Sequence, residues 1–200
     1  MKMREQTERM LPRLRDIRDM VEVLVSDLNV VLDELVTSGG NPLRRRLLIR
    51  TLFALVEGFL SGMASYLLDV HRVGRWELSD EEVAICEDLS PPAGPRGDRK
   101  SRADLVERMK VVFKAAHRVF GDPYRADFST VDFRKFRETI GVRDRLMHPK
   151  TPAHLQVSDE ELASADRARA WFKEASTLFF DGAIAYAAKE LREHQIRDHQ

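Results

Sequence analysis

Apolar residues recur every three or four positions along most of the chain, and this spacing predicts helices. The first row alternates steps of four and three, which is typical of a long helix packed almost parallel to a neighbour. The row comprises Met10, Leu14, Ile17, Val21, Leu24, Leu28, Val31 and Leu35. It predicts a helix from about Pro12 to Thr37. No segment has a strand pattern, so the expected fold class is all-α.

A short glycine-containing turn joins this helix to the next. Asn41 is placed to cap the second helix, and Pro42 occupies its first position, where proline is tolerated. So short a turn makes the two helices antiparallel neighbours. The second helix, to about Val70, is apolar on most of its circumference, which predicts a central buried helix. Gly58 and Gly62 give it a small-residue face that another backbone can approach closely.

Capping residues mark the later helices. Ser79 and Glu82 have the spacing of a capping box and predict a short helix to about Leu89. Further helices are expected from Ser101 to Gly121 with Asp104 in the first turn, from Ser129 or Thr130 to about Met147, and, after a second box of Ser158 with Glu161, for about thirty residues. Prolines and glycines predict a flexible loop at 90–100. We expect one domain, 1–200: an antiparallel helical bundle with two long N-terminal helices and a long C-terminal helix.

Charge and composition narrow the classes of function. The chain has 33 Lys and Arg against 33 Asp and Glu, so its formal net charge is zero. This balance excludes a protein that holds nucleic acid by bulk charge, because non-specific affinity comes mainly from neutralised phosphates. Any nucleic-acid contact must therefore be local. A hydrophobic content of 43% is too high for a disordered chain.

The sequence also bears on cofactors and compartment. Cys86 is the only cysteine, so no internal disulfide forms, and no group of cysteines and histidines has zinc-ligand spacing. The first residues are charged, unlike a signal peptide, and the uncharged run at 58–68 is much shorter than the roughly 20 residues of a membrane span. We expect a soluble cytoplasmic protein, away from membranes, without a metal or other cofactor.

The most informative segment is 133–150. Four apolar residues share one helical face there: Phe133, Phe136, Ile140 and Met147. The same spacing places Arg143 in that row. A guanidinium is rarely buried alone, so Arg143 is expected to contact a carboxylate, a helix C-terminus or a ligand anion. Pro149 ends the helix at His148, which lets the imidazole fold back toward the same site.

Two charged residues of the second helix need partners, and Arg143 is a candidate partner for one of them. Arg50 and Glu57 lie seven residues apart on one face of an otherwise apolar helix. Buried charges are usually paired. Glu57 is therefore expected either to hold Arg143 in place or to form a purely structural pair, such as one with Arg50 through an intermediary.

The residues Arg143-Asp144-Arg145-Leu146-Met147-His148 resemble the motif of the HEPN superfamily, in which an arginine beside a polar residue precedes a histidine by a few positions. The helix order is also similar, with a long antiparallel pair, the motif at the end of a late helix and a final long helix. The resemblance covers most of the chain in helix order but only about six residues as a motif. Without it, Arg143 would be a salt-bridge partner and His148 a C-cap at the negative end of the helix.

The resemblance implies a metal-independent endoribonuclease of the toxin, phage-defence or stress-response type. Such enzymes act as homodimers in which the two motifs face one another. His148 would be the general base or acid at the ribose 2′-hydroxyl and the leaving 5′-oxygen. Arg143 would stabilise the phosphoryl oxygens, and Asp144 would orient the histidine or the arginine. The products would carry a 2′,3′-cyclic phosphate and a 5′-hydroxyl.

Further residues and partners follow from the same expectation. Arg137, Arg145 and Lys150 are candidates for binding substrate phosphates, and Glu57 and Arg50 for supporting the motif from the second helix. RNA is the expected substrate and an antitoxin protein a candidate partner. The alternative function is a non-catalytic dimeric helical module that binds a protein partner or a nucleotide.

Overall fold

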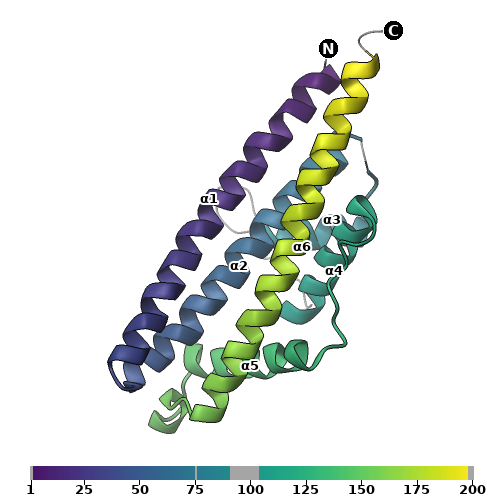
Figure 1. Cartoon of the computed structure of the whole chain (residues 1–200). Coiled ribbons are helices and arrows are strands. Elements are labelled where there is room, and N and C mark those ends of the chain that lie inside the picture. The colour runs from purple at the N-terminus through teal and green to yellow at the C-terminus, as the bar shows by residue number, and fades with distance from the viewer. Residues whose placement is uncertain (1, 75, 91–103, 198–200) are drawn as a thin grey trace, which may run out of the picture. The chain divides into compact units, whose positions relative to one another are not determined.

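The computed structural model describes residues 2–74, 76–90 and 104–197, and side chains from 11 to 193 within those ranges (Figure 1). Its elements are α1 (Lys2–Thr37), α2 (Pro42–Arg72), α3 (Asp80–Leu89), α4 (Leu105–Phe120), α5 (Val131–Met147), the 3₁₀ turn η1 (Pro152–Leu155) and α6 (Asp159–Arg197). These residues contain no strand, and the all-α prediction with long first, second and last helices is confirmed. The loop predicted at 90–100 lies, apart from Ser90, outside the described residues.

The helices form two compact units. Unit 1 comprises the chain up to Asp19, Phe59–Ala126 and the chain from Ser176; unit 2 comprises Met20–Gly58 and Asp127–Ala175. α3 and α4 belong to unit 1, whereas α5 and η1 belong to unit 2. α1, α2 and α6 contribute residues to both units. The single domain expected from the sequence stays a prediction.

Local capping chemistry sets several helix ends as predicted. Asn41 Oδ1 accepts a hydrogen bond from the Leu43 N–H at 2.8 Å, and the preceding glycines have positive φ, which glycine adopts without strain. Both capping boxes form: Ser79 with Glu82, and Ser158 with Glu161. Thr130 is the residue that caps α5, since its hydroxyl accepts from the Phe133 N–H at 3.0 Å.

Other helix ends differ from the prediction. α1 begins ten residues before Pro12, because residues 2–11 are mostly strong helix formers and the helix continues through the proline. Asp104 is the N-cap of α4 rather than part of its first turn, since its carboxylate accepts from the Glu107 N–H at 2.9 Å. α6 has 39 residues rather than about thirty. The turn η1 was not predicted.

The small-residue face of α2 is where α1 packs. In unit 2, a Cβ added to Gly58 would lie 2.8 Å from Leu24 Cδ1, and in unit 1 a Cβ added to Gly62 would lie 2.9 Å from Ile17 Cγ2. α2 is long and apolar enough to cross a membrane by composition, but 61% of its most apolar window is buried within the fold. This burial is the pattern expected of the central helix.

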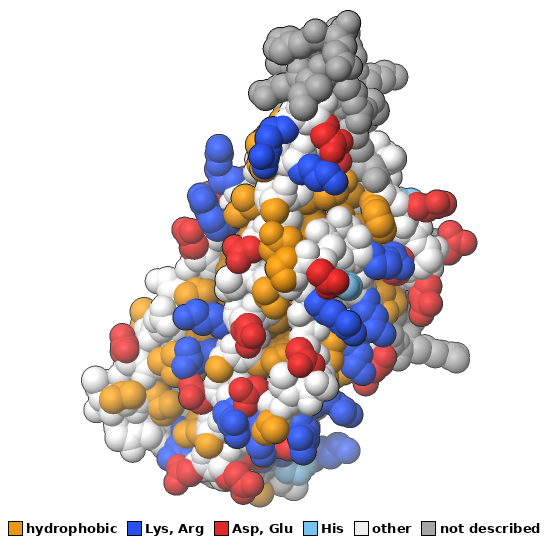
Figure 2. Space-filling view, turned by 45° about the vertical axis from the view of Figure 1, so that its right-hand side comes forward, with side chains coloured by type: hydrophobic (Ala, Val, Ile, Leu, Met, Phe, Trp, Pro, Cys, Tyr) orange, Lys and Arg blue, Asp and Glu red, His pale blue; other side chains and the backbone are white. Residues whose placement is uncertain are grey.

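Aromatic side chains fill both cores. The rings that pack in unit 2 include Phe53, Phe133, Phe136, Trp171 and Phe172. Those that pack in unit 1 include Phe59, Tyr66, Phe113, Phe120 and Phe179. α6 supplies rings to both units. On the molecular face shown in Figure 2, acidic side chains lie among the basic ones.

Candidate functional site

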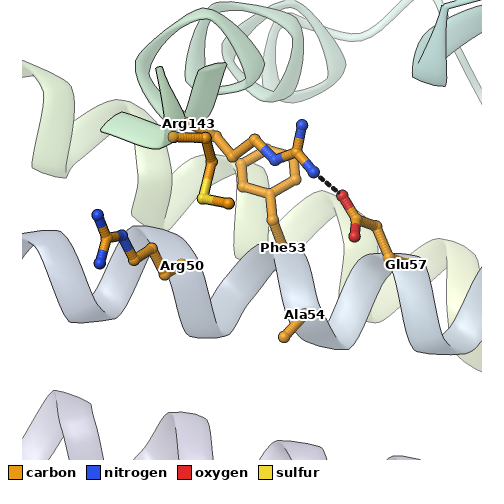
Figure 3. Close-up of a pocket in the computed structure, with 6 residues that line it drawn as sticks. Arg50, Phe53, Ala54, Glu57 and Arg143 are labelled. Carbon is orange, nitrogen blue, oxygen red and sulfur yellow. Dashed lines mark hydrogen bonds and ion pairs between the residues drawn. The ribbon is translucent and has the colours of Figure 1, made fainter. Parts of the chain in front are cut away.

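An open groove of about 390 Å³ lies between α2 and α5 of unit 2 (Figure 3). It is lined by Arg50, Phe53, Ala54 and Glu57 from α2 and by Arg143 and Met147 from α5. Steps of three and four place each set on one stripe of its helix. Phe53 is buried against Phe136, with ring centroids 5.7 Å apart, so the aromatic core of the unit supports the groove.

Arg143 is held between two carboxylates. Its guanidinium reaches from α5 to Glu57 on α2 (Figure 3), and its Nη1 lies 2.9 Å from Asp144 Oδ1. The predicted contact with a carboxylate is therefore present, and Glu57 makes the contact with Arg143 that the sequence offered as one alternative. A guanidinium has five N–H donors. Those not directed at Glu57 and Asp144 remain available to an oxyanion in the groove.

Arg50 does not pair with Glu57. Its Nη2 donates to the Leu146 carbonyl oxygen at 3.1 Å, and its guanidinium extends away from Glu57 (Figure 3). Leu146 lies in the last turn of α5, where carbonyls lack helical partners and carry partial negative charge. Within the described part of the chain, no carboxylate forms an ion pair with Arg50. Its positive charge is thus bonded only to a neutral group.

His148 is the C-cap of α5, as the following proline predicts. Its backbone N–H donates to the Asp144 carbonyl at 3.0 Å, and its side chain is exposed. The imidazole is not among the residues that line the groove. Within one chain, the expected folding back toward Arg143 is therefore not observed. Met147, at 48% exposure, occupies the groove mouth beside it.

Asp144 contacts its neighbour Arg143, whereas Arg145 contacts residues outside the motif. Asp144 bonds to Arg143 rather than to His148, which is one of the two roles expected for it. Arg145 pairs with Glu161 at 2.7 Å and donates to the Gln156 carbonyl at 2.9 Å. A substrate phosphate would have to compete with both of these partners.

Arginines also fix the segment between η1 and α6. Three consecutive carbonyls each accept from a different arginine: Leu155 from Arg46 at 3.3 Å, Gln156 from Arg145 at 2.9 Å, and Val157 from Arg45 at 3.0 Å. The loop after His148 is closed further by the Lys150 N–H, which donates to His154 Nδ1 at 3.1 Å. The basic run at 44–46 is visible in the sequence, but its partners are not. Arg44 pairs with Glu34 and Arg45 with Asp159, and the backbone carbonyls that Arg45 and Arg46 reach have no sequence signature.

The remaining predicted phosphate ligands, Arg137 and Lys150, are exposed and form no ion pair within the described ranges. Arg134, on the same helix as Arg137, is likewise exposed and without an ion pair in the described part of the chain. The charges close to the groove nearly cancel, with Arg50 and Arg143 set against Glu57 and Asp144. One chain therefore offers a mixed-charge groove rather than a strongly basic cleft.

Neither a metal cluster nor a reactive thiol is found in the described residues. No group of three or more His, Cys, Asp and Glu side chains there could hold a metal ion. Cys86 is buried. Burial, with the nearby charge of Glu82, raises the pKa of its thiol to about 12, so the thiol stays protonated at neutral pH.

Comparison with known proteins does not identify a relative. No protein-family model matches the chain, and neither a curated protein nor a solved structure shows significant similarity to it. The resemblance to HEPN domains thus rests on the motif and the helix order alone. What is shown for this protein is that its described residues form six α-helices.

Proposed function

We propose that this protein is a metal-independent endoribonuclease that acts as a homodimer, with Arg143 and His148 of both copies in one cleft. One observation carries the proposal. At the end of α5, the exposed imidazole of His148 lies close in sequence to an arginine that two carboxylates hold over an open groove. A proton-transfer group and a fixed oxyanion-binding group at one helix end are the parts that RNA transesterification uses.

The proposed reaction is an attack by the ribose 2′-oxygen on the adjacent phosphorus. One imidazole accepts the proton of the 2′-hydroxyl, the bond from phosphorus to the 5′-oxygen breaks, and a second imidazole donates a proton to that oxygen. Each chain supplies one His148, so two copies provide both the base and the acid. Arg143 stabilises the charge that develops on the phosphoryl oxygens. The nucleophile belongs to the substrate, so the step requires no metal-bound water.

A second candidate is a non-catalytic dimeric module that binds a protein partner or a nucleotide. Two observations favour it. Glu57 and Asp144 offset the charge of Arg143, and His148 lies outside the groove of its own chain. Under this alternative, the motif would be a polar interface, and its variants would alter binding without any RNA cleavage.

Variants of the motif distinguish the two candidates. His148→Ala is expected to lower the rate of RNA cleavage by roughly 100-fold or more, because it removes general acid–base catalysis. Arg143→Ala is expected to lower it by roughly 100- to 1,000-fold through lost charge stabilisation. Both variants should also abolish growth toxicity while keeping the helical circular-dichroism spectrum.

Arg134→Ala is the matched control, because it removes an exposed arginine from the same helix without touching the groove. It should cleave RNA like the wild type. Full cleavage by both motif variants would contradict the nuclease proposal.

A further inference from the structure

Arg50 differs from the other cation of the groove in what it contacts. Arg143 is bound to two carboxylates, whereas Arg50 is exposed and makes one described hydrogen bond, to the neutral Leu146 carbonyl. That bond uses one of its five N–H donors. Of the two groove-lining arginines, Arg50 therefore keeps the charge and the donors that an anion needs.

The contact also places Arg50 at the end of α5 that carries the motif histidine. Leu146, whose carbonyl it reaches at 3.1 Å, is two residues before His148. Met147 lies between them in sequence and lines the groove with Arg50. A group bound to Arg50 would thus lie near the end of α5 that His148 caps, with an apolar surface of Met147, Ala54 and Phe53 next to it.

We propose that Arg50 binds a phosphodiester group of RNA at the mouth of the groove. This inference rests on the proposed function and gives Arg50 a direct role in substrate binding in place of the supporting role expected from the sequence. An arginine fork bonds two phosphate oxygens at once, which suits a phosphodiester. The apolar side chains beside it would contact the sugar or the base.

A purely structural role for Arg50 makes a different prediction. If the side chain only bonds the last turn of α5, removing its charge would leave the affinity for RNA unchanged. Arg50→Gln removes the charge and keeps an amide N–H donor on a shorter side chain, and the unfolding temperature reports whether the contact with the Leu146 carbonyl matters to the fold. The matched control is Arg134→Gln, which removes the same charge from an exposed position on α5 outside the groove.

The experiment measures binding of a single-stranded 2′-O-methyl RNA oligonucleotide, which cannot be cleaved because its 2′-oxygen is blocked. Fluorescence anisotropy over a series of salt concentrations gives the affinity and its salt dependence. Arg50→Gln is expected to weaken binding by about tenfold and to reduce the slope of log K against log salt by about 0.7, the value for one phosphate contact on a single strand. Arg134→Gln is expected to bind like the wild type, and both variants should unfold at the wild-type temperature.

Several outcomes would overturn the inference. These are wild-type affinity in Arg50→Gln, an equal loss in Arg134→Gln, or no binding by the wild-type protein. Competition by adenosine monophosphate as effective as that by the oligonucleotide would also overturn the assignment to RNA. If Arg50→Gln weakens binding as expected but the wild-type protein cleaves no RNA, the Arg50 site stands and the nuclease proposal fails.

Discussion

At the scale of residues, two carboxylates restrict the motion of the Arg143 side chain in the groove. A free arginine loses rotamer entropy when it binds a phosphate, about 2 kcal/mol for a side chain of this length. Glu57 and Asp144 restrict Arg143 before any ligand arrives. The same carboxylates weaken its attraction for anions at a distance. Arg143 is therefore suited to stabilising charge that forms in the groove, and Arg50 to attracting the substrate.

Part of this arrangement was predictable at the level of residues. Helical spacing placed Arg143 in an apolar row, and the need to pair a guanidinium predicted a carboxylate, a helix C-terminus or a ligand anion as its partner. Spacing alone left the role of Glu57 open between two pairings, because choosing between them requires the relative position of α2 and α5. The sequence left two directions open for the imidazole of His148, folded back toward Arg143 or exposed at the C-cap, because the following proline restricts the torsions of the C-cap residue without fixing them.

Glu82 makes part of the stability of unit 1 depend on pH. Burial alone would raise the pKa of Glu82, but the backbone N–H of Ser79 and the guanidinium of Arg118, 2.6 Å away, outweigh it and lower that pKa. A lowered pKa in the folded state means that the ionised carboxylate stabilises the native protein. This contribution is complete above the ordinary glutamate pKa and is lost as the pH falls through the folded-state value.

Glu82→Gln keeps the capping box, since glutamine also serves at that position, but loses the charged contact with Arg118. The variant is expected to be roughly 1–2 kcal/mol less stable than the wild type at pH 7. The difference should begin to shrink below about pH 4, where the carboxylate of the unfolded state becomes protonated, and should be lost as the pH falls through the lowered pKa of the folded state. Urea unfolding at several pH values measures it. A difference that stays constant across this range would show that ionisation of Glu82 does not stabilise the fold.

At the scale of elements, two helical glycines differ in their surroundings. An added Cβ at Gly62 meets the β-branched Ile17 at 2.9 and 3.2 Å, and this side chain has little freedom to move away. An added Cβ at Gly141, in the interior of α5, meets nothing within 4 Å. The first glycine is required by the packing of α1 on α2, and the second only weakens its helix.

Alanine at each position therefore shifts stability in opposite directions. Gly62→Ala is expected to destabilise the protein by about 1–3 kcal/mol through overpacking. Gly141→Ala is expected to stabilise it by about 0.5–1 kcal/mol through helix propensity. Thermal unfolding of the two variants beside the wild type gives the comparison. Stabilisation by Gly62→Ala would mean that α1 does not approach α2 closely there.

The sequence predicted helix ends and turns best where residues close together in the chain determine them. The capping boxes at Ser79 and Ser158 and the turn before Pro42 involve residues within a few positions of one another, and all three are present. The contacts of Arg46 and Arg45 with the carbonyls of Leu155 and Val157 join residues about a hundred positions apart in the chain. Such contacts follow from tertiary packing and leave no periodic pattern.

At the scale of the whole molecule, the proposed RNA cleavage requires a second copy of the chain. One chain offers one His148, which lies outside its own groove, and a groove whose charges nearly cancel. Two copies would supply the second proton-transfer group. A zero net charge excludes bulk attraction to RNA but leaves such a shared site open.

The active species should therefore be a dimer. Light scattering coupled to size exclusion is expected to give twice the 23.0 kDa mass of the chain at concentrations where RNA is cleaved. His148→Ala and Arg143→Ala should give the same mass, because the proposal assigns their losses to chemistry rather than assembly. Cleavage by a species with the mass of one chain would contradict the shared site.

The chemistry at the scissile phosphate determines which ends the cleaved RNA carries. These ends therefore test the proposed nuclease activity most directly. Purified protein is incubated with bulk RNA in the presence of EDTA, and the new ends are identified by mass spectrometry. We predict 2′,3′-cyclic phosphates and 5′-hydroxyls from the wild type and from Arg134→Ala, and intact RNA from His148→Ala. Intact RNA with the wild type, or new 3′-hydroxyl and 5′-phosphate ends, would contradict the proposal.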